Sequence, residues 1–283
     1  MFEVNGKEFE TFEEAQLEVT RMQEEDNNKP NAAFFGLSSR RMMQLLTHPF
    51  EEGGLLFIQD PIEDAVLNRM FFLTTAESLL QMLMDKGSIK LTDKGELPDA
   101  VAKKLFPSDP FVDFKIGKKV IAGKASFVEV VKDVCRLAGL TKRIKGEYSL
   151  TKNGEKALKG NDRLDILLPI LGAYMNKFDW TSNDDLQKNC TQFISPFAMY
   201  MLTKIYNAGD EITIEEMADK LLHAFPEINT QNRDELMLTF AKRFVYAFLY
   251  YFGFISYSED GTDMSEKAFI LNDGFEKTFI VEY

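Results

Sequence analysis

Two stretches of this chain share one order of elements, and this repeat constrains the fold more than any other feature. In the first, an apolar helix ends at Leu137–Leu140, and a polar hairpin leads into Tyr148–Lys156. In the second, Tyr251–Phe254 is followed by a longer polar hairpin and then by Phe269–Lys277. Both stretches reach a second glycine before a last short helix. We interpret this order as the back half of a winged-helix domain, which is a helix-turn-helix variant.

The residues before each stretch complete the pattern. Apolar side chains recur at spacings of three and four from Phe127 to Ala138, which predicts an amphipathic third helix. The second copy is expected to comprise helices at 196–208, 214–224 and 234–252, with a strand at 211–213. The sequence therefore predicts a mainly α protein with short β-hairpins (an α+β class), built from tandem winged-helix-like units.

We divide the chain into four parts. Residues 1–30 form a small appendage, in which an Asn-Gly turn predicts a β-hairpin and Thr11 caps a helix that runs to about Glu25. The composition of residues 26–31 predicts a linker. Residues 31–160 form the first winged-helix-like domain with a leading helix, which Ser38 or Ser39 caps. In this domain we expect a loop around 51–61, a helix at 78–85 and a hairpin turn at Lys145-Gly146. Residues 161–195 form a helical bridge, and residues 196–283 form the second winged-helix-like domain.

Length and composition indicate a globular protein with room for two cores. The chain has 283 residues, of which 45% are hydrophobic and 28% are charged. No run approaches the roughly 18 apolar residues of a membrane-spanning helix, and residues 1–6 lack the pattern of a secretory signal. The two cysteines, Cys135 and Cys190, lie far apart in the sequence. We expect a cytoplasmic protein without a stapling disulfide and without membrane contact.

Charge is distributed unevenly along the chain. The formal net charge is −12, which disfavours general coating of nucleic acid. Residues 101–163 nevertheless contain 15 Lys/Arg against 7 Asp/Glu. This basic middle is the electrostatic feature that supports a specific hypothesis.

Several phrases resemble a family of uncharacterised bacterial proteins related to plasmid-borne open reading frames. They are Gly36-Leu37-Ser38 with Pro49-Phe50, Lys90–Pro98, Ala138-Gly139-Leu140, Leu150–Gly154 and Phe178-Asp179-Trp180. The similarity spans roughly residues 32 to 275. Some members carry a cysteine-rich metal-binding tail that this chain lacks, so the resemblance implies neither a metal nor an activity.

The basic middle, residues 101–163, suggests a specific function, which is nucleic-acid binding. In a winged helix the third helix can enter the major groove while the wing contacts the neighbouring backbone. The corresponding candidates for nucleic-acid binding are Lys132 and Arg136 on the third helix, and Lys142, Arg143 and Lys145 at the wing. Further phosphate contacts are expected from the preceding loop, through Lys115, Lys118, Lys119 and Lys124. Acidic residues share the polar face of this helix, and Asn and Gln for reading base edges are missing from it.

The second copy favours protein contacts instead. Its long helix is apolar around nearly the whole circumference, so it either forms the spine of the domain or presents one side to another chain. Tyr246 and Tyr250 are the candidate interface residues. The expected second wing contains Glu259, Asp260, Asp263 and Glu266, which would repel phosphate.

Candidate chemistry is sparse. The two histidines, His48 and His223, are distant from each other and from the cysteines, so the sequence predicts no metal site and no cofactor. We expect a non-catalytic interaction or regulatory protein that binds a protein partner or itself. The alternatives are a DNA- or RNA-binding regulator that uses the first unit, and an enzyme without a recognisable motif.

Overall fold

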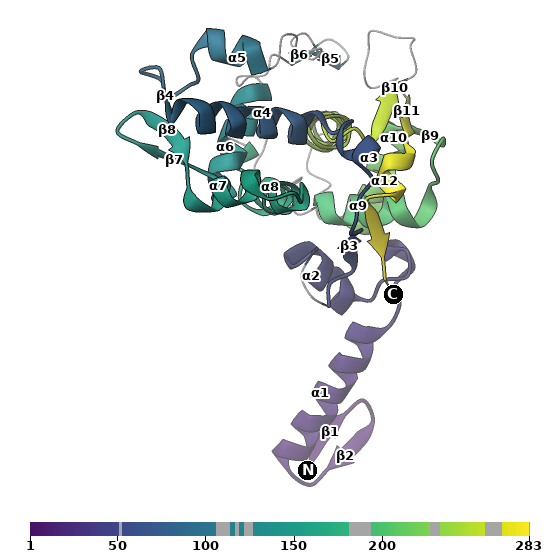
Figure 1. The fold of residues 1–283 in the computed structure, drawn as a ribbon. Helices are drawn as coiled ribbons and strands as arrows, with labels where there is room; N and C mark the ends of the chain where they lie inside the picture. Colours follow the sequence, from purple (N-terminus) through teal and green to yellow (C-terminus); the bar gives the residue numbers. More distant parts are fainter. Residues whose placement is uncertain are drawn as a thin grey trace.

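The computed structural model describes residues 1–50, 53–105, 114–116, 119–121, 127–180, 194–226, 233–257 and 268–282. They form a mixed α+β fold of helices and small antiparallel sheets (Figure 1). None of the helices in these ranges is long and apolar enough to cross a membrane. The predicted second wing at 258–267 and Cys190 lie outside the described residues, as do the side chains of the lysines between residues 115 and 124.

The N-terminal appendage forms an arm that projects from the body (Figure 1). Its elements are β1 (Phe2–Val4), β2 (Lys7–Phe9) and α1 (Phe12–Asn28). Asn5 and Gly6 have φ angles of 50° and 75°, as expected for a two-residue hairpin turn. Thr11 caps α1 as predicted, through a reciprocal capping box with Glu14. The helix runs to Asn28, into the stretch that composition marked as a linker, because Asn28 and its neighbours continue the helical hydrogen bonds.

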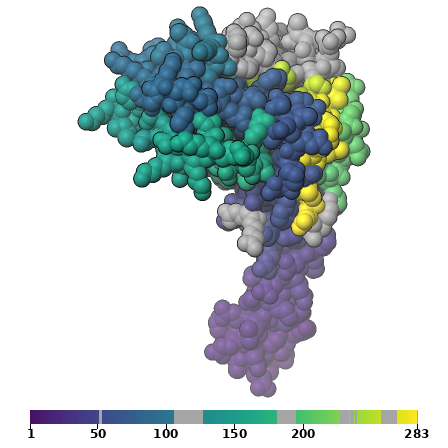
Figure 2. Space-filling model, viewed as in Figure 1, coloured from purple at the N-terminus to yellow at the C-terminus, as the bar shows by residue number. Residues whose placement is uncertain are grey.

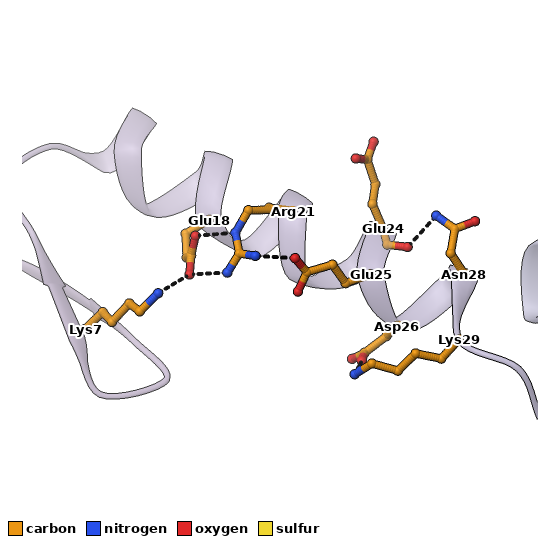
Figure 3. Close-up of polar contacts among 8 residues, drawn as sticks. All are labelled: Lys7, Glu18, Arg21, Glu24, Glu25, Asp26, Asn28 and Lys29. Carbon is orange, nitrogen blue, oxygen red and sulfur yellow. Dashed lines mark hydrogen bonds and ion pairs between the residues drawn. The ribbon is translucent and has the colours of Figure 1, made fainter.

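Ion pairs stiffen one side of the arm (Figure 3). Glu18 accepts hydrogen bonds from Arg21 at 2.8 Å and from Lys7 of β2 at 3.0 Å. These two cations lower the pKa of Glu18 to about 2. Arg21 also pairs with Glu25 one turn further along α1. The contact between Lys7 and Glu18 fastens the hairpin to the helix.

A short turn joins the arm to the first unit, residues 31–160. After η1 (Ala32–Phe34), the unit contains α2 (Ser39–Thr47), β3 (Leu56–Ile58), α3 (Asp64–Leu67), α4 (Phe71–Lys86), β4 (Ser88–Lys90), α5 (Asp99–Leu105), β5 (Phe114–Ile116), β6 (Lys119–Ile121), α6 (Phe127–Leu137), β7 (Thr141–Ile144), β8 (Glu147–Leu150) and α7 (Lys152–Lys159). Ser38 caps α2 as expected. α4 begins seven residues before the expected start at Ser78, because Phe71–Glu77 extends its buried face.

The predicted hairpin of the first unit is confirmed. β7 and β8 are joined by Lys145 and Gly146, whose φ angles of 51° and 81° fit the tight turn that the sequence indicated. β8 is the central strand of a three-stranded antiparallel sheet with the order β4-β8-β7. Ile89 and Arg143 lie opposite Tyr148 on its two sides. This register directs Ile89 and Tyr148 into the core.

The helix predicted in the bridge is present, and residues 181–193 of the bridge lie outside the described residues. α8 (Leu164–Asn176) buries most of its side chains against α6 and α7. Arg163, just before it, donates two hydrogen bonds to Glu77 of α4, at 2.7 and 2.8 Å, and one to Asn68. This paired contact holds the start of α8 against α4.

The segment predicted as the second unit, residues 196–283, has a similar element order, without counterparts of β5 and β6 among its described residues. It contains α9 (Ile194–Ile205), β9 (Glu211–Thr213), α10 (Ile214–Ala224), α11 (Arg233–Phe240), η4 (Ala241–Tyr250), β10 (Ile255–Tyr257), β11 (Ala268–Leu271), α12 (Asp273–Glu276) and β12 (Phe279–Val281). Its sheet has the order β10-β11-β9, again with the last hairpin strand in the centre. The expected long helix is present, but its second part, η4, is a π-helix, which hydrophobic periodicity did not predict.

The two units share one hydrogen-bond pattern where the third helix ends. Gly139 and Gly253 adopt φ angles of 75° and 70°. Leu140 N–H donates to Cys135 O at 3.0 Å, and Phe254 N–H donates to Leu249 O at 2.8 Å. In return, the carbonyls of Leu140 and Phe254 each accept from the residue that follows the hairpin. Both helices therefore end in the same left-handed glycine turn, which directs the chain into the hairpin.

The units meet at an aromatic junction that the sequence did not predict. Phe72 of α4 stacks on Phe252 with ring centroids 4.9 Å apart, and Phe127 stacks on Tyr251 at 4.0 Å. The Phe72 N–H at the start of α4 donates to Tyr251 O. A Cβ atom at Gly253 would lie 2.3 Å from Arg69 O, so only glycine permits this approach. Buried residues of both units belong to one hydrophobic cluster.

A second unpredicted contact links the ends of the body. β12 pairs antiparallel with β3, a segment that the sequence indicated as a loop. Phe279 of β12 is buried against Phe50, Phe254 and Phe275. Strands of three residues have little local sequence pattern from which they can be predicted. The pairing of β3 with β12 depends on residues more than 200 positions apart in the chain.

Candidate functional site

Lys132 is buried inside the first unit, where the sequence predicted an exposed position on α6. Its residue exposure is 6%. The ammonium donates to Gly95 O at 2.8 Å and forms an ion pair with Glu129. Glu129 also accepts from Leu97 N–H at 2.7 Å. Lys132 therefore fastens α6 to the 91–97 loop and does not face a phosphate. Helical periodicity missed this role because the loop crosses the polar face of α6.

The other four basic candidates are exposed. Arg136 lies one turn after Lys132, with its guanidinium 3.8 Å from Asp133. Lys142, Arg143 and Lys145 follow on β7 and its turn. The Arg143 guanidinium lies over Gly95, where a Cβ atom would come within 2.5 Å of it. Four of the five predicted cations are thus exposed, on α6, on β7 and in the turn after β7.

Three of these cations, Arg136, Lys142 and Arg143, border a cleft of about 840 Å³ between the 91–97 loop, α6 and β7. Its charged lining consists of Lys94, Lys132, Arg136, Lys142 and Arg143 together with Glu96, Asp99, Glu129 and Asp133. Cations and carboxylates are nearly balanced in number. The cleft is therefore less electropositive than the sequence distribution indicated, and the excess positive charge lies at its β7 rim.

Buried polar groups beneath the cleft serve the packing. The Tyr148 hydroxyl donates to Lys132 O at 2.7 Å and lies 2.6 Å from the Thr141 hydroxyl. Burial raises the pKa of Tyr148 well above its ordinary value and raises the pKa of Cys135 to about 12. At neutral pH the Cys135 side chain is a protonated thiol that packs as a small apolar group. Within the described ranges, no three His, Cys, Asp or Glu side chains are placed to hold a metal ion.

The two predicted interface tyrosines differ in exposure. Tyr246 on η4 is 5% exposed, so it lies in the core. Tyr250 is half-buried, with its ring centroid 5.9 Å from that of Phe71, which is 41% exposed. Phe71 is thus the more accessible aromatic side chain of this pair. The sequence missed it because it precedes the predicted start of α4.

The arm is the feature that sequence reasoning left without a role. Half of the large apolar side chains that are exposed among the described residues belong to it: Met1, Phe2, Phe12, Leu17 and Val19. Figure 2 shows the arm as a lobe that stands apart from the body. Only Ala15 of α1 is buried. The sequence already indicated that these apolar side chains would be exposed, because a 30-residue segment is too short to bury them in a core of its own.

No family model, no curated protein and no solved structure matches this chain. The resemblance to a bacterial family related to plasmid-borne open reading frames therefore stays a prediction.

Proposed function

We propose that this protein is a non-catalytic interaction protein that is built from two winged-helix-like units and whose arm makes contacts with protein. The duplicated architecture is supported by the shared glycine turns after α6 and η4 and by the matching sheet orders. Equivalent registers add to this support, since Ile89 and Ile212 lie opposite Tyr148 and Phe269 on the central strands.

The burial of α6 argues against groove reading by the first unit. α6 packs against α4 and α8, and its one buried cation, Lys132, is already bound to Glu129 and Gly95. A helix enclosed in this way offers little side-chain surface to base edges. The winged-helix-like units then act mainly as a rigid body that carries contact surfaces.

The exposed apolar side chains of the arm carry the proposal. Phe12 and Leu17 are 61% and 71% exposed, and they project on a helix that extends from the body. Apolar side chains gathered on one small projection are typical of surfaces that another protein covers.

The test replaces Phe12 and Leu17 with Asp in the full chain. We expect the doubly substituted protein to show a lower mass in analytical ultracentrifugation, or to lose proteins that co-purify with the wild type. Leu168→Asp on α8, where the side chain is 44% exposed, is the matched control. Unchanged mass and unchanged co-purification in the arm variant would contradict the proposed function.

A second candidate, nucleic-acid binding through the wing, rests on Lys142, Arg143 and Lys145. They lie within four consecutive residues and are exposed, and no described carboxylate forms an ion pair with any of them. Each phosphate contact lowers the slope of log K against log salt by about 0.9.

For this candidate, duplex DNA is titrated at low salt. Replacing the three residues with Ala should reduce the salt slope by roughly two to three. Lys152→Ala with Lys156→Ala, on the exposed side of α7, is the control. Absence of binding at low salt, or an unchanged slope in the triple variant, would remove this candidate.

A further inference from the structure

The outer face of the β4-β8-β7 sheet is a basic surface with an apolar centre. Thr141 and Tyr148 are buried and define the inner face. Strand alternation then places Lys142 and Ile144 on the outer face, and Lys142 also borders the cleft because β7 is an edge strand. Ile144 is 56% exposed and lies opposite Glu147, which in turn lies opposite Lys90. We call Lys90, Lys142, Ile144, Lys145 and Glu147 the wing surface.

The wing surface contains three lysines and one carboxylate, Glu147. Glu147 accepts a hydrogen bond from the Ser88 hydroxyl at 2.8 Å. In the part of the chain that the structure describes, no carboxylate lies within ion-pair distance of Lys90, Lys142 or Lys145. The wing surface therefore carries a net charge of two positive units, with Ile144 at its centre.

A complementary stripe runs along α1. Leu17 lies on the side of α1 away from the hairpin, with Glu13 one turn before it and Glu24 two turns after it. Arg21 lies beside this stripe, but it is bound to Glu18 and Glu25 (Figure 3). The stripe thus presents two carboxylates around an exposed leucine.

We infer that the α1 stripe of one copy docks on the wing surface of a second copy. Leu17 meets Ile144, and Glu13 and Glu24 meet the surrounding lysines. This inference rests on the proposed function and names the partner of the arm. We select the α1 stripe as the partner of the wing surface because both have an exposed apolar side chain and their surrounding charges are opposite.

Charge also excludes pairing between two arms. Residues 1–30 contain nine carboxylates and three cations, so two arms repel each other. The same excess attracts the arm to the basic middle of the chain. The acidic arm and the basic wing surface of this chain are therefore complementary in charge.

The arm does not reach the wing surface of its own copy. α1 leaves the body beside α2, whereas β7 and β8 lie on a different side of the body (Figure 1). Residues Pro30 and Ser38 form an antiparallel β-bridge, and Asn31 N–H donates to Leu37 O at 2.9 Å, which sets this direction. Reciprocal docking of two copies uses both arms and both wings, which closes a two-fold dimer.

The test is a charge swap in the full chain, read as mass by analytical ultracentrifugation. One variant carries Glu13→Lys and Glu24→Lys, and the other carries Lys142→Glu and Lys145→Glu. We expect each variant alone to dimerise at least tenfold more weakly than the wild type, since repulsion replaces attraction in both contacts. An equimolar mixture should dimerise like the wild type, because both contacts of the mixed dimer are again between opposite charges.

Matched controls change the same number of charges elsewhere. Glu3→Lys with Glu8→Lys alters the outer face of the hairpin, and Lys152→Glu with Lys156→Glu alters α7. Both controls should dimerise like the wild type.

Three outcomes overturn the inference. If the mixture of swapped variants stays as weak as its components, the arm and the wing do not meet. If the wild type is a monomer whose arm binds another protein, the inference fails although the proposed function stands. An arm that affects neither mass nor co-purification rejects both.

Discussion

At the scale of single residues, burial decides what a charged side chain does. Lys132 and Arg136 occupy the same sequence pattern one turn apart, but their side chains are 7% and 46% exposed. Inside the protein, Lys132 forms an ion pair with Glu129 and donates a hydrogen bond to Gly95 O, whereas Arg136 is exposed at the surface. A buried pair of this kind is costly to break, because the remaining partner keeps an uncompensated charge.

We therefore expect Lys132→Met to destabilise the protein by about 3 kcal/mol, because Glu129 is left buried without its cation. Urea denaturation followed by circular dichroism measures this loss. Lys142→Met, at an exposed position of β7, should change the free energy of unfolding by less than about 0.5 kcal/mol. Similar values for the two variants would show that Lys132 is not part of the packing.

At the scale of elements, the likeness between the two units lies in their glycine turns and strand registers rather than in their side chains. The left-handed glycine turns at Gly139 and Gly253 are alike, but α12 is shorter than α7. Ion pairs of Asp273 stabilise this short helix. Asp273 in its first turn binds Arg69 at 2.8 Å and Lys277 at 3.1 Å.

These contacts predict a dependence of stability on pH. Hydrogen bonds from Lys277 and then from Arg69 lower the pKa of Asp273 below its ordinary value of 3.8. The carboxylate therefore stabilises the fold above about pH 4, and this contribution is lost as the pH falls through the lowered pKa. Asp273→Asn should lower the urea midpoint at pH 7 but leave it close to the wild-type value at the acid limit.

Asp93→Asn, at an exposed position of the 91–97 loop, is the control for this measurement. It should leave the difference between pH 7 and the acid limit as in the wild type. A midpoint difference between Asp273→Asn and the wild type that is the same at every pH would contradict the assignment.

At the scale of the whole molecule, contacts between distant segments join the two units. β12 pairs with β3, and the aromatic junction around Phe72 and Phe252 is continuous with the cores on both sides. A shared core of this kind couples the unfolding of the parts that it connects.

Phe279→Ala tests this coupling. We expect a loss of about 3 to 5 kcal/mol from the cavity that the ring leaves. The single tryptophan, Trp180, is buried against Tyr174 and Phe178 in the bridge. In Phe279→Ala, the unfolding midpoint followed by Trp180 fluorescence should move to a lower urea concentration, together with the midpoint followed by circular dichroism. Ile280→Ala, one residue on and 43% exposed, should have little effect. A Trp180 transition that does not move would show that the two units unfold separately.

The sequence by itself determined the local elements of this protein. Helical periodicity, caps such as Thr11 and Ser38, and the Asn-Gly and Lys-Gly turns act over a few residues, so they predicted the order of helices and strands and the α+β class. Only the tertiary structure decided which of these elements meet. The burial of Lys132 and Tyr246, the π-helix and the pairing of β3 with β12 depend on neighbours far along the chain. Local propensity contains no record of those distant partners, because their effect on conformation arises only when the core is assembled.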